Sequence, residues 1–198
     1  MILFYDTETS GLPDKRQLSN LDVQPHIMQL AFSLYDDQRR PVLEVSTLVA
    51  LPEWAVCSPE ALATHGITPE MTRQYGMNPD AALRLLSYAA NRAEVCVAHN
   101  EKFDLMLLEF AALRLATKSP LAGRKTFCTM EASTGILQLP PTERMRKYGM
   151  GPYKNPKLSE CWTYFFGEEL SGAHDALVDT RGCARVYYEL LDKGHITV

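Results

Sequence analysis

The chain has 198 residues, 46% of them apolar, which suits one globular domain with its own core. Its net charge of −4 argues against binding duplex DNA through overall charge alone, but bound divalent cations would cancel acids locally, so nucleic acid is not excluded. No apolar run approaches the roughly 18 residues of a membrane span, no signal-peptide pattern opens the chain, and five scattered cysteines without a Cys-x-x-Cys pair predict reduced thiols. We therefore expect a cytoplasmic protein without membrane contact, with one domain over residues 1–198 and its core over about 2–191.

The first half of the chain predicts strands followed by helices. Residues 2–5 are apolar and run into a polar loop with glycine, which predicts a buried strand. Residues 27–35 and 42–49, joined by a polar turn, predict an antiparallel hairpin. Helices with polar caps and an early proline are then expected at residues 58–63, 69–72 and 79–92.

The second half predicts strand–helix units. A short buried strand over residues 95–98 precedes a helix over 101–116, whose apolar residues recur at helical spacing. The further expected elements are an edge strand at 126–128 and helices at 130–137, 158–166 and 175–191. Residues 138–157 are rich in proline and glycine and look irregular. This order predicts a mixed sheet flanked by helices.

Two acids follow the first predicted strand. Alternation along a strand places Asp6 and Glu8 on the same face if the strand continues that far, and a metal ion would then bind between their carboxylates. An Asp-x-Glu pair occurs by chance about once in such a chain, so a polar strand end is an equal alternative for this motif alone. Thr7, Thr9 and Gly11 beside the acids offer hydroxyl groups and close backbone approach, so they are predicted substrate contacts.

Two further acids lie near predicted helix starts. Asp104 falls in a first helical turn, where the helix dipole alone would favour an acid. His174 precedes Asp179 by five residues, which would separate them by about 140° on one continuous helix. If Asp175 is the N-cap, His174 lies in the preceding loop and can reach the side that Asp179 presents. It would then suit a general base, with a surface histidine as the alternative.

Three segments resemble, in order and spacing, the motifs of the DEDD exonucleases: residues 4–12 (FYDTETSGL), 97–104 (VAHNEKFD) and 173–179 (AHDALVD). In having a histidine five positions before the last aspartate, the chain resembles the DEDDh branch of this family. That branch contains the proofreading subunit of bacterial replicative polymerase. Residues 64–68 (THGIT) resemble a segment of that branch. Residues 127–130 (FCTM) resemble the exonuclease X group, although many relatives carry aspartate where this chain has Cys128.

The resemblance implies a ribonuclease H-like α/β fold with a mixed five-stranded sheet flanked by helices. It implies two Mg²⁺ or Mn²⁺ ions, with Asp6 bridging both and His174 accepting the proton of the attacking water. The ligands that it implies are Asp6, Glu8, Asp104 and Asp179. The implied activity is a 3′→5′ exonuclease that releases 5′-nucleoside monophosphates from DNA, preferably at single-stranded or frayed ends.

The resemblance also suggests substrate contacts. Leu12 resembles an apolar wedge beside the terminal base, with a core position in the turn as an equal alternative. Phe103 faces either the terminal nucleotide or the core. His65, His99 and Asn100 match positions that line the nucleotide pocket or fix its loops, and a structural role for His99 is equally expected.

The predicted irregular segment is basic, with Tyr148 and Tyr153 interleaved. Basic and aromatic side chains together suit the phosphates and bases of a single strand, and a solvated loop is the alternative. The basic residues are Arg144, Arg146, Lys147, Lys154 and Lys157.

The expected partner is a nucleic acid with a free 3′ end, DNA before RNA. Because no motif reports how a 2′-hydroxyl is treated, an exoribonuclease that trims RNA or short oligoribonucleotides is one alternative. A non-catalytic polymerase accessory subunit with structural acids is another. A homodimer and an association with a polymerase both stay open.

Overall fold

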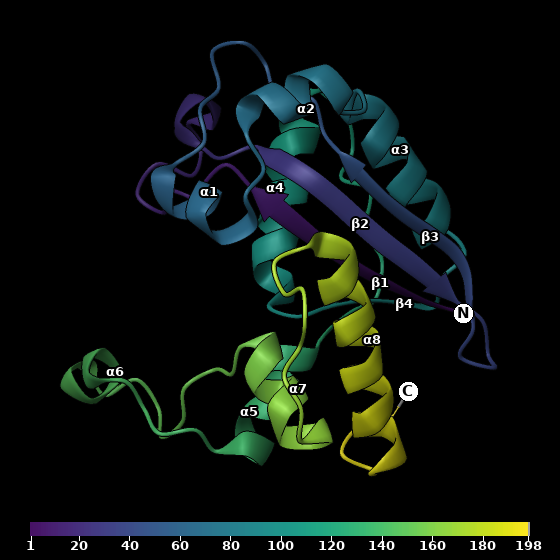
Figure 1. Cartoon of the computed structure of the whole chain (residues 1–198), viewed down its shortest axis with the longest axis vertical. Coiled ribbons are helices and arrows are strands. Elements are labelled where there is room, and N and C mark those ends of the chain that lie inside the picture. The colour runs from purple at the N-terminus through teal and green to yellow at the C-terminus, as the bar shows by residue number, and fades with distance from the viewer. Residues whose placement is uncertain (198) are drawn as a thin grey trace.

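Five strands form one mixed sheet in the computed structural model, which describes residues 1–197 (Figure 1). The strand order is β3-β2-β1-β4-β5. The β1–β2 and β2–β3 pairs are antiparallel, whereas the β1–β4 and β4–β5 pairs are parallel. The bounds are β1 (Ile2–Thr9), β2 (Ile27–Tyr35), β3 (Pro41–Leu48), β4 (Val95–Ala98) and β5 (Thr126–Cys128). The predicted five-stranded mixed sheet is therefore confirmed.

Helices flank this sheet, and several begin at the caps that the sequence predicted. Ser58, Thr68 and Asn78 each accept a hydrogen bond from the first helical turn, directly before a proline. No helix within residues 1–197 has the length and apolar character that crossing a membrane requires. The bounds are η1 (Leu21–Val23), α1 (Pro59–His65), α2 (Pro69–Tyr75), α3 (Pro79–Ala90), α4 (Glu101–Arg114), α5 (Thr129–Leu137), α6 (Glu143–Tyr148), α7 (Leu158–Phe166) and α8 (Ala176–Asp192).

The core lies on both sides of β1, the middle strand. Leu3 and Tyr5 are fully buried in a cluster with side chains of α3 and α4, whereas Phe4, between them in the sequence, packs in a second cluster with α8. In Figure 1, α8 crosses in front of the sheet and α4 lies behind it. Among the apolar residues that recur at helical spacing over 101–116, Leu107 and Phe110 are buried on α4 as expected, whereas Leu115 lies beyond the helix end and is 36% exposed. The two layers hold β1 in a fixed position.

Two segments differ from the sequence prediction, and the first is the strand predicted over residues 2–5, which continues to Thr9. The irregular structure expected over residues 138–157 is wrong for their middle, where α6 forms. Thr142 caps the first turn of this helix, and Gly149, in the left-handed region at φ 62°, ends it. The surrounding prolines and glycines conceal these two signals in the sequence.

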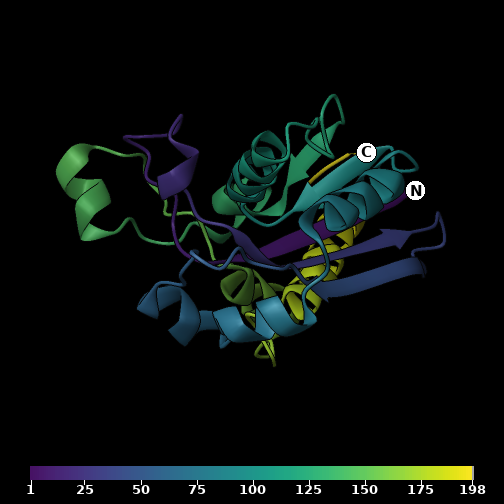
Figure 2. The ribbon, with the colours of Figure 1, turned by 90° about the horizontal axis from the view of Figure 1, so that it is seen from above.

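We call residues 139–155 the arm. Figures 1 and 2 both show α6 at the end of this segment, projecting away from the sheet. In the described part of the chain, the hydrogen bonds of residues 140–153 all stay within the arm, and the Lys154 amide closes its base by donating to the Leu139 carbonyl at 3.1 Å. The arm therefore depends on few contacts with the rest of the molecule.

Candidate active site

Two carboxylates lie side by side on the end of β1. The strand continues to Thr9, so Asp6 and Glu8 share one face, as the alternation predicted. Both are half-buried. The intervening Thr7 points to the opposite side and is only 6% exposed.

Thr7 holds the third acid. Asp104 lies in the first turn of α4 and is 3% exposed. Its Oδ1 accepts hydrogen bonds from the Thr7 amide, at 3.0 Å, and from the Thr7 hydroxyl, at 2.7 Å. The sequence suggested Thr7 as a substrate contact, but in the structure its hydroxyl orients Asp104.

The fourth acid and the histidine come from the start of α8. Asp175 caps this helix by accepting from the amides of Leu177 and Val178, so His174 lies outside it, in the left-handed region at φ 72°. The predicted loop position of His174 is confirmed. The His174 amide donates to Asp179 Oδ2 at 3.0 Å, which joins the loop to the acid.

Gln29 on β2 fixes the start of α8 to the sheet, a role that sequence reasoning missed. Its Oε1 accepts from the Ala176 amide at 3.2 Å, and its Nε2 donates to Asp175 Oδ2 at 3.4 Å. The side chain is 8% exposed. A polar residue at a buried strand position was the only available signal, and the sequence does not show its partner.

The acids converge, and the charge of His174 lowers the pKa of Asp179 without offsetting the effect of burial. Burial, and then the neighbouring Asp104 and Asp179, raise the pKa of Asp6 well above its usual value. Burial, followed by the charges of Asp179 and Asp104, raises the pKa of Glu8 to about 8. Burial also raises the pKa values of Asp104 and Asp179. Several partly buried carboxylates that repel one another are stable together when a cation neutralises them.

The donor atoms fit a divalent cation. One atom each from Glu8, His174 and Asp179 lies within 4.8 Å of the others. The buried Oδ1 of Asp179 has no hydrogen-bond partner within residues 1–197. Hard carboxylate oxygens suit Mg²⁺ and Mn²⁺. Two members of this group, Glu8 and Asp179, are predicted metal ligands, whereas His174 was predicted as the general base, and the ligand roles of Asp6 and Asp104 stay predictions.

Near the end of β1, His65 orders the backbone. The Ile67 amide donates to its Nδ1 at 2.9 Å, so the proton lies on Nε2, which donates to the Thr9 carbonyl at 3.1 Å. Burial lowers the pKa of His65 and favours this neutral form. The Thr9 hydroxyl donates to the carbonyl of Gly11 at 2.9 Å. These side chains shape the loop after the acids.

Leu12 follows this loop and is 84% exposed, so the alternative that it is a core residue is wrong. Phe103 is half-buried and packs against the core on α4. Asn100 is exposed and occupies the left-handed region at φ 70° directly before α4. Contact with substrate stays a prediction for all three residues.

His99 connects the end of β4 to the base of the arm. Burial lowers its pKa to about 4, so the ring is neutral. Its Nε2 donates to the Pro156 carbonyl at 3.0 Å, and its Nδ1 accepts from the Thr129 hydroxyl at 2.9 Å. Both ring nitrogens are thus engaged in holding the structure.

The predicted basic residues divide into two groups. Arg144, Arg146 and Lys147 lie exposed on α6. Lys154 instead forms a 2.6 Å ion pair with Glu160, and the exposed Lys157 is the N-cap residue of α7. The first group therefore has the greater freedom to meet a phosphate.

Comparisons with known proteins point to one family. The family model RNase T, described as exonuclease, matches residues 3–187. Solved structures of similar fold include Escherichia coli exonuclease I bound to a dA16 oligonucleotide (TM-score 0.73, 17% identity) and to a dT13 oligonucleotide (0.74, 19%). An exonuclease I from Methylocaldum szegediense is also similar (0.70, 20%).

The matched region is nearly all of this chain but a minor part of those proteins. The two Escherichia coli structures align with 96% of this chain and 40% of their own, and the Methylocaldum szegediense structure with 97% and 40%. The chain thus spans about two fifths of the length of the exonucleases that it resembles. No curated protein matches it.

Proposed function

Since the chain belongs to the exonuclease family, in its DEDDh type, we propose that it is a metal-dependent 3′→5′ exonuclease. Its substrate is a DNA strand with a free 3′ end, single-stranded or frayed, and its products are 5′-nucleoside monophosphates. The observation that carries this proposal is the convergence of four acids and His174 from β1, α4 and the start of α8.

The acids would hold two Mg²⁺ or Mn²⁺ ions. Such ions, when bound, lower the pKa of water and stabilise a departing oxygen. The ligands that we propose are Asp6, Glu8, Asp104 and Asp179. Thr7 fixes the orientation of Asp104 from behind, as partners of metal ligands commonly do.

His174 acts as the general base that accepts a proton from the attacking water. Its place in the loop leaves its ring exposed, while its amide is tied to Asp179. Its backbone is therefore positioned although its ring remains free to meet water. A base held in this way is typical of proton transfer in hydrolysis.

Substrate contacts follow from exposure. Leu12 lies beside the terminal base, and the loop that Thr9, Gly11 and His65 order approaches the same nucleotide. The basic side chains of α6 contact the phosphate backbone of the strand. DNA is preferred in this proposal because the exonuclease I structures of similar fold contain dA16 and dT13 oligonucleotides.

A degradation assay tests the proposal. Labelled strands of about 15 nucleotides, in DNA and RNA versions, are incubated with Mg²⁺ or Mn²⁺, with a chelator control and an Asp179→Asn variant. We expect the DNA strand to shorten from its 3′ end and to release mononucleotides. The chelator and Asp179→Asn should each abolish this reaction.

Two results would contradict the proposal. Faster degradation of the RNA strand would identify an exoribonuclease. The absence of any metal-dependent product, with oligonucleotide binding unchanged in Asp179→Asn, would identify a binding module with structural acids. Sedimentation of the protein alone would show whether it forms the homodimer that stays open.

A further inference from the structure

A hollow of about 400 Å³ lies beside the end of β1 and is lined by exposed apolar side chains. Leu12, Val23, Trp54 and Val56 line it and are 84, 45, 62 and 78% exposed. Apolar side chains gathered in one exposed patch typically mark a binding surface. Among the described residues that line this hollow, Asp22 is the one charged side chain, so the hollow does not attract phosphate.

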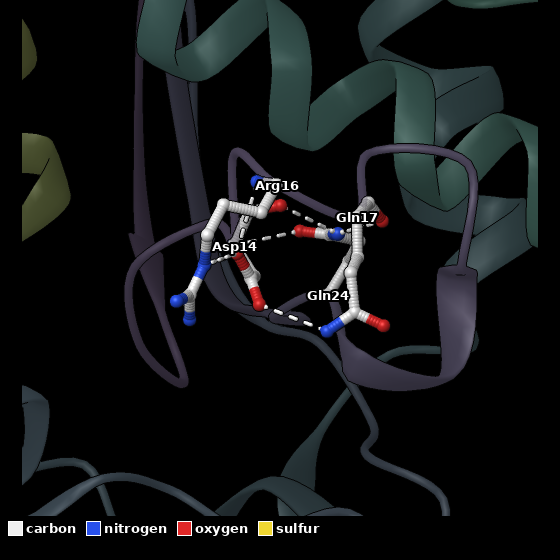
Figure 3. A network of polar contacts seen from close by, with 4 residues as sticks. All are labelled: Asp14, Arg16, Gln17 and Gln24. Atoms are coloured by element: carbon white, nitrogen blue, oxygen red, sulfur yellow. Dashed lines mark hydrogen bonds and ion pairs between the residues drawn. The ribbon is translucent and has the colours of Figure 1, made fainter.

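One wall of the hollow is the turn between β1 and β2, which is tightly held. The buried Gln24 accepts from the Asp14 amide and donates to the carbonyls of Asp14 and Gln17 (Figure 3). Arg114 at the end of α4 donates to three carbonyl oxygens within residues 21–25, at 2.6 to 3.0 Å. These bonds fasten the wall to the body of the protein.

The opposite wall is the loop that follows β3, and a second arginine holds it. Arg73 of α2 donates to the carbonyls of Glu53 and Ala55 at 2.9 and 2.8 Å. The Ser58 amide donates to the Ser10 carbonyl at 2.8 Å, which joins this loop to the end of β1. The hollow is therefore formed before any ligand arrives, as small-molecule sites usually are.

Trp54 and His26 give the hollow its chemistry. Their rings meet edge to face with centroids 5.3 Å apart, which leaves much of the indole exposed. The His26 Nε2 is buried and has no hydrogen-bond partner within residues 1–197. Both rings also line a larger, mainly apolar cavity of about 690 Å³. A flat ligand suits the exposed face of the indole.

The hollow lies close to the catalytic acids. Ser10 and Gly11, which line it, follow Glu8 by two and three residues. At a rise of about 3.3 Å per residue, the hollow begins within about 10 Å of the Glu8 backbone. A strand whose 3′ end meets the acids is therefore within reach of this hollow.

We infer that this hollow binds one nucleobase of the strand under degradation, upstream of its 3′ nucleotide and stacked on Trp54. The inference rests on the proposed function, which brings the strand to the end of β1. A base provides the flat apolar face that the exposed indole of Trp54 can stack on. Stacking on aromatic side chains is how proteins hold single strands without reading their sequence.

The test is a scan of single abasic sites. DNA strands of about 15 nucleotides, each lacking the base at one position counted from the 3′ end, are titrated by fluorescence anisotropy with chelator present, so that no hydrolysis occurs. We expect one upstream position at which the loss of the base weakens binding to the wild-type protein by about 5- to 150-fold, the range for one stacked base. Trp54→Ala should bind intact and abasic strands equally weakly.

Two variants serve as controls. Trp54→Phe keeps an aromatic face and should keep the position dependence, which separates stacking from a folding defect. Tyr164→Ala removes an aromatic side chain that is 56% exposed on α7 and should bind as the wild type does.

The inference is overturned if loss of the base at that position weakens strand binding to Trp54→Ala as much as it weakens binding to the wild-type protein. It is also overturned if dTMP alone binds with the same dependence on Trp54, because the hollow then takes a free nucleotide. The degradation assay is read separately: an active enzyme without Trp54 dependence refutes this inference alone, whereas an inactive one refutes the proposed function.

Discussion

The carboxylate centre and the arm are both rooted at the carboxyl ends of the central strands, but the protein holds them differently. Asp104 accepts two hydrogen bonds from Thr7, a residue of the middle strand of the sheet, and α8 is tied to β2 through Gln29. The arm is joined near its base by the bond from His99 to Pro156, and its tip projects freely (Figures 1 and 2).

This difference separates two tasks. Metal ligands and a general base must keep their geometry to fractions of an ångström, which requires buried, hydrogen-bonded support. Basic side chains attract phosphates over about 10 Å at moderate salt and need no fixed partner. Changes in the centre should therefore alter the rate of the chemical step, whereas changes in the arm should alter affinity and its dependence on salt.

Among changes that leave the proposed metal ligands in place, the largest effect is expected for His174→Ala. Removal of a general base should lower single-turnover rates by about 10² to 10⁴-fold while metal binding, measured by calorimetry, changes little. His195→Ala, which removes an exposed histidine after α8, is the matched control. A rate within a few-fold of the wild type would refute the base role, and a loss of metal affinity would make His174 a ligand, as its place beside Glu8 and Asp179 allows.

Thr7→Val should have the next largest effect, because it deletes the hydroxyl that orients Asp104. Loss of such a partner typically costs about 10- to 100-fold in metal affinity or activity. The hydrogen bond from the Thr7 hydroxyl lowers the pKa of Asp104, so its loss should raise that pKa, while the bond from the backbone amide remains. Since the carboxylate binds metal in its ionised form, the rise of activity with pH should then move to higher pH.

The pH profile distinguishes this role from a loss of stability. Thr7→Ser keeps the hydroxyl and should restore both the rate and the profile. Thr134→Val removes a hydroxyl that bonds to the Met130 carbonyl within α5 and should leave both unchanged. An unshifted profile in Thr7→Val would show that the hydroxyl does not act through Asp104.

The sequence predicted the centre far better than its supports. Asp6, Glu8 and the loop position of His174 follow from local patterns, namely alternation in a strand and a capping aspartate. The bonds from Thr7 to Asp104 and from Gln29 to the start of α8 join residues 97 and 147 positions apart. No local pattern encodes such pairs, because they depend on how the helices pack against the sheet.

At Leu12 and in the arm, the sequence did not decide the local environment of the residues. The sequence predicted a core position and a surface position for Leu12 equally, because one apolar residue in a turn fits both environments. The structure shows that it is exposed. In the arm, the composition concealed the helix, since prolines and glycines flank a segment with good caps at both ends. Neither position has neighbours in the sequence that would decide its environment.

The smallest effect is expected in the arm. Replacing Arg144, Arg146 and Lys147 by glutamine should weaken single-strand binding and reduce the slope of log affinity against log salt by up to about 2, since each phosphate contact contributes about 0.7. Rates at saturating substrate should stay near those of the wild type, because the arm supplies no group to the carboxylate centre.

A second triple variant serves as a control for the change in total charge. Lys118, Arg124 and Lys125 precede β5, whose parallel pairing with β4 places its amino end away from the carboxylate centre. Replacing these three by glutamine changes the net charge equally, so it should leave the slope nearly unchanged if the position of the charge matters. Equal losses of slope in the two triple variants would show that the arm acts only through total charge, and an unchanged slope in the arm variant would make α6 a solvated helix. A reduced slope confined to the arm variant would establish that a segment with few fixed contacts guides the strand to a rigid centre.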